Sequence, residues 1–228
     1  MKFAVVRIVL ISWFFAHVGS AQGVESGHEF FGFIRLFNAV GVGSGKLDFM
    51  IDGKSVRASG YQLGNVTGGI ALKPGFHKVV VRRDGVGECT TRVQVKADDT
   101  CVLIPFAEQL PATDKQPARW EIRILRLKQH ESEERRTASL VSVSREPELK
   151  VEIRQADGTW GSVFVKRLGV ARKDIPQARG YLTVRCNGRE LSPVSVAAAG
   201  NFVSVLYEDE SGVLQSKSFQ DYKYLSAE

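Results

Sequence analysis

Apolar and polar residues alternate one by one through most of this chain, which is the pattern of half-buried β-strands. In residues 149–154, three apolar side chains face one way and three charged side chains face the other. Strand-like segments are separated by turn dipeptides, of which Asn187-Gly188 and Asp52-Gly53 are the strongest signals for tight hairpins. Helical periodicity is almost absent. The pattern therefore predicts an all-β protein.

The alternation lapses at residues 109–119, which contain two prolines and mixed charges. This composition predicts a linker between two units, each of the size of a small sandwich domain. We expect two tandem antiparallel β-sandwich domains, Ig-like or jelly-roll-like, at residues 28–108 and 120–228. Within residues 120–127 the apolar set changes from one strand face to the other, which predicts a β-bulge near Ile124.

The two expected domains resemble each other in the spacing of their strands. Gly75-Phe76 and Gly180-Tyr181 each open a strand that is followed by a turn and two further strands. An internal duplication would give this spacing, and so would a chance match between β-hairpins.

The N-terminus has the features of a secretory signal. Lys2 and Arg7 accompany a short apolar run, and residues 19–21 are small, so we expect a signal peptide at residues 1–21. The apolar run is shorter than the roughly 20 residues that a membrane-spanning helix needs. The mature chain is therefore expected to be periplasmic or secreted and to lack a membrane span.

The charge is only modestly basic. The chain has 31 Lys and Arg against 25 Asp and Glu, a net charge of +6 that falls to +4 when Lys2 and Arg7 leave with the signal. The cations are scattered among acids, which is not the concentrated basic face of a nucleic-acid-binding protein. Weak attraction to an acidic polysaccharide stays open.

Export permits a disulfide between Cys89 and Cys101. A hairpin with its turn at residues 96–99 would put Cys101 opposite Gln94 and Cys89 about 17 Å away, so the bond requires a different strand pairing. Cys186 alternates with apolar residues and is expected to be buried.

Catalytic signatures are missing. Residues 41–46, GVGSGK, lack the first glycine and the hydroxyl of a phosphate-binding loop, and His28, His77 and His130 are isolated. We therefore expect no enzyme, no cofactor and no metal site. A hydrolase or transferase with a site assembled across the domains is the competing class.

Aromatic side chains are the best candidates for binding. Phe33, Arg35 and Phe37 share one face of an expected strand, and Trp160 follows a turn. Such rings stack on a flat ligand or cover a partner strand when exposed. Burial of the rings in a core or between domains is the alternative.

Residues 47–85 resemble a family of uncharacterised bacterial cell-surface β-sandwich domains. The resemblance rests on an alternating strand that leads into Asp52-Gly53-Lys54, on Gly64, and on Pro74-Gly75-Phe76 at the start of another strand. With residues 33–39 added, the region is also similar to the start of the periplasmic alginate O-acetylation protein F family. The charged loop at residues 128–136 departs from that family.

The resemblance implies a non-catalytic adaptor or scaffold in an extracytoplasmic assembly that O-acetylates a polysaccharide. Its partners would be extracytoplasmic proteins such as a polysaccharide acetyltransferase, bound through exposed strand edges. The alternative is a carbohydrate-binding or cell-surface adhesion module that uses Phe33, Phe37 or Trp160.

Overall fold

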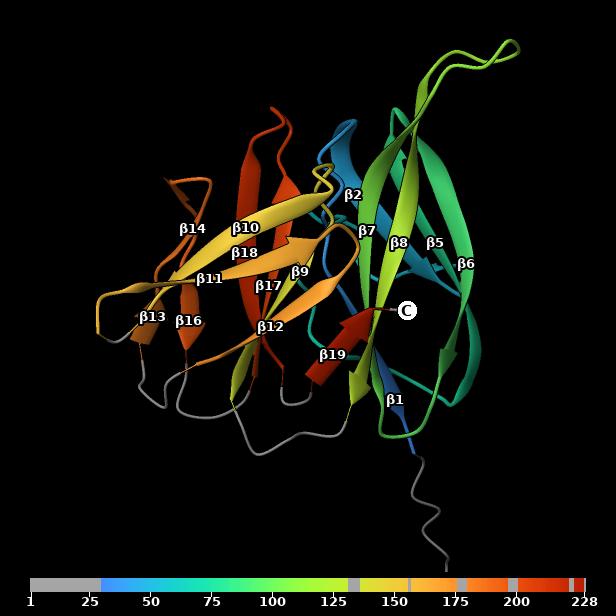
Figure 1. Ribbon diagram of the computed structural model, residues 1–228. Helices are drawn as coiled ribbons and strands as arrows, with labels where there is room; N and C mark the ends of the chain where they lie inside the picture. The colour runs from blue at the N-terminus through green and yellow to red at the C-terminus, as the bar shows by residue number, and fades with distance from the viewer. Residues whose placement is uncertain are drawn as a thin grey trace, which may run out of the picture.

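The computed structural model describes residues 30–130, 136–155, 157–175, 180–196, 201–221 and 224–227. The expected signal peptide at residues 1–21 lies outside these residues. Every regular element in the described part is a β-strand (Figure 1), so the all-β prediction is confirmed. No helix there is long and apolar enough to cross a membrane.

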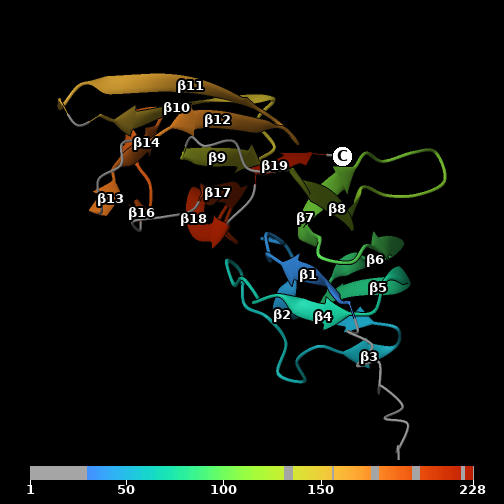
Figure 2. The same cartoon turned by 90° about the horizontal axis from the view of Figure 1, so that it is seen from below.

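The first half of the chain forms one nine-stranded sheet that curls into a half-barrel around a buried cluster (Figures 1 and 2). The strand order is β3-β2-β5-β6-β8-β7-β1-β4, and the C-terminal strand β19 pairs with β8. The bounds are β1 (Gly32–Leu36), β2 (Ser44–Ile51), β3 (Lys54–Ser55), β4 (Ile70–Leu72), β5 (Gly75–Asp84), β6 (Val86–Val95), β7 (Thr100–Leu110), β8 (Arg119–His130) and β19 (Tyr224–Ala227).

The second half forms three smaller sheets, with strand orders β11-β10-β14-β15, β12-β9-β17-β18 and β13-β16. The two four-stranded sheets enclose a second buried cluster between them (Figure 2). The bounds are β9 (Thr137–Ser142), β10 (Glu148–Arg154), β11 (Trp160–Lys166), β12 (Val170–Asp174), β13 (Gly180–Leu182), β14 (Val184–Cys186), β15 (Arg189–Glu190), β16 (Val194–Val196), β17 (Asn201–Glu208) and β18 (Leu214–Asp221).

One four-strand arrangement occurs in both halves. In β4-β1-β7-β8 and in β12-β9-β17-β18, the outer pairs are antiparallel and the central pair is parallel. The glycines that were expected to open matching strands also share a backbone conformation, with φ of +147° at Gly75 and +141° at Gly180. The repeated topology supports an internal duplication.

The two repeated sheets pack against each other through a third buried cluster, called the shared core below. It takes roughly equal parts from the two halves: Phe37, Ala39, Val102, Ile104, Phe106, Leu125 and Leu127 from the first, and Val141, Val143, Val203, Val205, Tyr207 and Phe219 from the second. The halves are therefore joined by a continuous apolar interior.

Residues 109–119 were predicted as a linker between two domains, but in the structure they lie in a hairpin of one sheet. They form the end of the β7–β8 hairpin, which projects beyond the rest of the fold (Figure 1). Prolines and polar residues are equally suited to a hairpin tip, which explains the difference. Strand β8, expected to begin the second domain, belongs to the first sheet.

The predicted bulge near Ile124 is wrong. The β7–β8 register runs from Cys101 opposite Lys128 to Leu110 opposite Arg119 without a shift. The apolar set changes face because β8 separates two cores. Ile122 and Ile124 pack in the half-barrel, whereas Leu125 and Leu127, on the opposite face of the strand, pack in the shared core.

Candidate functional site

Phe37 lies in the shared core. It is fully buried, with its ring centroid 5.6 Å from that of Tyr207 and 6.2 Å from that of Phe219. The Arg35 guanidinium covers the Phe219 ring at 4.7 Å and donates a 2.8 Å hydrogen bond to the Gln220 carbonyl. Both candidates therefore hold the two halves together instead of facing a ligand.

Trp160 is half-buried and covered by a cation. The guanidinium carbon of Arg185 lies 3.9 Å from the centroid of the indole, and Arg185 Nε donates a 2.7 Å hydrogen bond to Glu152. The cation–π contact and the ion pair fix Arg185 over the ring. One face of the Trp160 ring is thus occupied by the protein itself.

Phe33 lines a groove in the half-barrel with a volume of about 420 Å³. Strand β6 pairs with β8 only at Gly87 and Glu121 within the described chain, and the groove opens farther along these two strands. We call it the cationic groove. Its walls carry two aromatic rings and four cations, namely Phe33, Phe76, Arg92, Lys96, Arg126 and Lys128.

Among the described residues that line the cationic groove, the four cations are accompanied by one carboxylate, Asp99. Arg92 and Lys96 are exposed on the β6 side, and the β8 side adds two cations that are two residues apart, or about 7 Å along the strand. Phe76 is 69% exposed at the groove, beside this charge. An exposed phenyl ring packs on the apolar face of a sugar ring, while cations pair with carboxylates.

Sequence reasoning named Phe33 but missed the cations. A signal existed in residues 122–128, where the strand face that carries Ile122 and Ile124 continues with Arg126 and Lys128. The groove could not be inferred from it, because the opposite wall comes from β6 through a parallel contact between strands that are distant in sequence.

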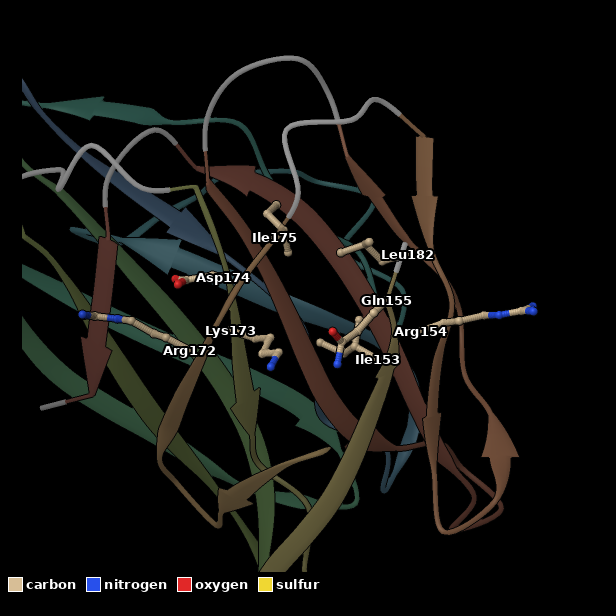
Figure 3. A pocket seen from close by; sticks show the side chains of 8 residues that line it. All are labelled: Ile153, Arg154, Gln155, Arg172, Lys173, Asp174, Ile175 and Leu182. Atoms are coloured by element: carbon tan, nitrogen blue, oxygen red, sulfur yellow. The ribbon is translucent and has the colours of Figure 1, made fainter. Parts of the chain in front are cut away.

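A second cavity of about 540 Å³ lies at one end of the second half (Figure 3). It is lined by Ile153, Arg154, Gln155, Arg172, Lys173, Asp174, Ile175 and Leu182. Figure 3 shows Gln155 and Lys173 pointing towards each other across the opening, while Arg154 and Arg172 point away. None of these residues was named from the sequence as a binding candidate.

Asp52 and His77 form an acid–imidazole pair. Asp52 Oδ2 lies 2.7 Å from His77 Nδ1, and the Lys73 carbonyl lies 2.8 Å from His77 Nε2. Burial opposes protonation of His77, but the two hydrogen bonds and the Asp52 charge outweigh it and raise the His77 pKa, while the same pair lowers the pKa of Asp52. Both ring nitrogens are engaged, so the pair clamps the turn after β2 to β5 and is not arranged as a general base.

All three cysteines are free. Strand β8 lies between the strands of Cys89 and Cys101, so the hairpin assumed for them between β6 and β7 is not formed. Cys101 is opposite Lys128, whereas Gly87, two residues before Cys89, is opposite Glu121. The two cysteines are thus about five residues apart in level along β8, roughly 17 Å, and a disulfide needs Cα atoms within about 7 Å. The candidate disulfide is therefore not formed.

No group of three His, Cys, Asp or Glu residues in the described part of the chain is placed to hold a metal ion. Burial opposes ionisation of Asp209, but hydrogen bonds from Gln215, Ser211 and the Val213 amide hold its pKa at about 2. Asp209 thus serves as the acceptor that orders its own turn.

No protein-family model matches the chain, and no curated protein matches it.

Proposed function

We propose that this protein is a non-catalytic adaptor in an extracytoplasmic polysaccharide-modifying assembly, and that it holds an acidic polysaccharide in the cationic groove. The observation that carries this proposal is the combination of Arg92, Lys96, Arg126 and Lys128 with the exposed ring of Phe76 in one groove. The resemblance to the O-acetylation family supports the type of assembly, with a polysaccharide acetyltransferase as the protein partner.

The chemistry of the groove favours a polymer that carries both charge and sugar rings. One exposed ion pair contributes only about 0.2–1 kcal/mol, so a single carboxylate would bind weakly. A chain with regularly spaced carboxylates engages several cations at once, and the linked contacts raise the total affinity. Phe33 and Phe76 add ring contacts that a small inorganic anion could not use.

The adaptor role also needs a surface for a protein partner. Strand β18 ends its sheet and, among the described strands of that sheet, pairs only with β17. Arg35 occupies the Gln220 carbonyl near the end of this strand, and the part of the edge before Gln220 is long enough for a partner strand to add to it. We further propose that the two halves correspond to the expected β-sandwich domains, with the boundary moved from residues 109–119 to a point after β8, and that the mature chain is periplasmic or secreted.

A carbohydrate-binding or cell-surface adhesion module is the second candidate, favoured by the 69% exposure of Phe76. It would use the same groove without an enzyme partner. Recovery of an acetyltransferase with the protein from membranes of the source cells supports the adaptor. Polysaccharide binding with no such partner supports the module.

The groove is tested by charge reversal. The purified protein is titrated with polygalacturonate and with neutral dextran, and compared with the variant Arg92→Glu/Lys96→Glu. The matched control, Lys54→Glu/Lys217→Glu, changes the net charge equally at exposed positions outside the groove lining. We expect the groove variant to bind polygalacturonate at least about tenfold more weakly, because two attractions become repulsions.

We expect the Lys54→Glu/Lys217→Glu control to bind polygalacturonate like the wild type, and dextran to bind weakly to all three proteins. Equal losses in both double variants would mean that net charge, and not the groove, attracts the polymer. That result would overturn the proposed function.

A further inference from the structure

We propose that the cavity at the end of the second half (Figure 3) binds a small organic carboxylate with a compact apolar body, held by Lys173 and Gln155. The cavity shares no residue with the cationic groove, and the two sites belong to different halves of the chain. It therefore stands or falls independently of the proposed function.

Lys173 occupies a strand position that faces the interior. It is directly opposite Ala138 in the β12–β9 pair, and Ala138 is fully buried in the core between the two four-stranded sheets. Neighbouring side chains on the same face of β12, Ala171 and Ile175, pack in that core. A lysine at this place disturbs an otherwise apolar face, and a charge beside a core is costly unless it is paired.

The first half of the chain shows which residue occupies the position of Lys173 when the core there is entirely apolar. The parallel pairs β1–β7 and β9–β17 place Ile34 and Ala138 at corresponding points of the two halves. Opposite Ile34 on the edge strand is Ile70, which packs against the half-barrel core, whereas opposite Ala138 is Lys173. A cation stands in the second half where the first half completes its core with an isoleucine.

Gly161 makes room for the polar groups. It is opposite Ile153 in the β10–β11 pair and thus faces the same interior. A Cβ at this position would lie 2.6 Å from Gln155 Nε2 and 3.4 Å from Lys173 Nζ. The two head groups therefore converge over the glycine, and neither has a hydrogen-bond or ion-pair partner within the described part of the chain.

The convergence of an ammonium and an amide donor fits one carboxylate, which accepts a charge-assisted hydrogen bond from each. Ile153 and Ile175, 3% and 7% exposed, supply an apolar floor with Leu182 beside them. Arg154 and Arg172 point away from the cavity (Figure 3), and with Asp174 as the one carboxylate among the described lining residues the charge around the mouth is net positive. A cavity of about 540 Å³ lies in the range of small-molecule sites.

The probe is 1-anilinonaphthalene-8-sulfonate, an amphipathic anion whose fluorescence rises in apolar surroundings. It is titrated into the protein in the Arg92→Glu/Lys96→Glu background, which weakens anion binding in the cationic groove. We expect hexanoate to displace the probe and hexan-1-ol to displace it at least about tenfold less well, because the alcohol lacks the charge.

Two variants test the residues. We expect Lys173→Met to weaken both the probe and hexanoate about tenfold, while Lys166→Met, an exposed change on β11, has no effect. Gly161→Ala pushes the ends of two flexible side chains out of the site without touching backbone, and should weaken binding with little loss of stability. Gly68→Ala is its control, since nothing lies within 4 Å of the added carbon.

The competing explanation is that Lys173 keeps the edge strand β12 from pairing with another chain. In that case Lys173→Met would self-associate, and Gly161→Ala would bind the probe and hexanoate as the wild type does. Unchanged affinity in Gly161→Ala, or equal displacement by hexanoate and hexan-1-ol, overturns the proposed site even when Lys173→Met fails to fold.

Discussion

Replacing Phe37 by alanine should destabilise the whole chain, because Phe37 belongs to the core that both halves share. The side chain is fully buried and contacts the rings of Tyr207 and Phe219 from the second half. Burial of a phenylalanine side chain contributes about 1.5–3 kcal/mol, and each ring pair adds about 0.5–1.5 kcal/mol. With the cavity that remains, we expect Phe37→Ala to lower the free energy of unfolding by about 3–5 kcal/mol.

The measurement is urea unfolding followed by far-UV circular dichroism and by tryptophan fluorescence. Trp120 reports on β8 in the first half and Trp160 on β11 in the second. We expect circular dichroism and fluorescence to show the same single unfolding transition, because a continuous core couples the halves. The urea midpoint of this transition should be lower in Phe37→Ala. The control is Phe76→Ala, which removes a ring that is 69% exposed and should change the stability by less than about 0.5 kcal/mol.

Two results would refute this reasoning. One is a decrease of less than about 1 kcal/mol in the free energy of unfolding of Phe37→Ala, which would mean that the ring is not packed against Tyr207 and Phe219. The other is a Trp160 transition that stays at its wild-type position while the first half unfolds earlier. The halves would then be independent domains, as the sequence predicted, and the shared core would contribute little.

Two further predictions concern pH and thiols. The pKa of His77 is raised in the folded protein, so its contribution to stability is complete below the unfolded pKa of 6.5 and is lost as the pH rises through the folded pKa. The pKa of Asp52 is lowered, so its contribution is complete above the unfolded pKa of 3.8 and is lost as the pH falls through the folded pKa. Urea midpoints should therefore fall for the wild type as pH rises past 6.5, and His77→Gln should lack this dependence. Denatured protein that has not been reduced should contain three thiols per chain that react with a thiol reagent, because Cys89, Cys101 and Cys186 are free. A count of one reactive thiol per chain would mean that two of the cysteines form a disulfide. In the folded protein, Cys186, which is 2% exposed, and Cys101, whose pKa is raised by burial to about 11, should both alkylate slowly at pH 8.

Strand content could be predicted from the sequence because it depends on a local pattern. The alternation in residues 149–154 fixes which side chains of β10 are inward, and the turn at Asn187-Gly188 ends β14 as expected, with φ of +50° and +78°. Residues 109–119 failed as a linker for a physical reason. A hairpin tip and a linker have the same composition, and only the register of β7 against β8 tells them apart.

The change of apolar face within β8 carried more information than a bulge. Ile122 packs in the half-barrel, while Leu125 and Leu127 pack in the shared core. A strand that is apolar on both faces in succession is covered by two layers, as strands buried on both sides are. The pattern therefore contained evidence for contact between the halves, but it could not say which strands lie on the far side.

An internal duplication would explain why the two candidate sites differ. In both halves the repeated sheet gives one face to the shared core, and this face is apolar in each. Positions outside the shared core carry different residues in the two halves. At the edge strand, Ile70 closes the first core while the corresponding Lys173 opens a cavity in the second. In the first half, Arg126 and Lys128 line a groove on the half-barrel. Arg126 donates a hydrogen bond to Thr91 Oγ1, so the fold itself satisfies part of that cation. Lys173 has no such partner within the described residues, and an unpaired charge at an interior-facing position is costly for stability, so its presence is better explained by binding than by folding.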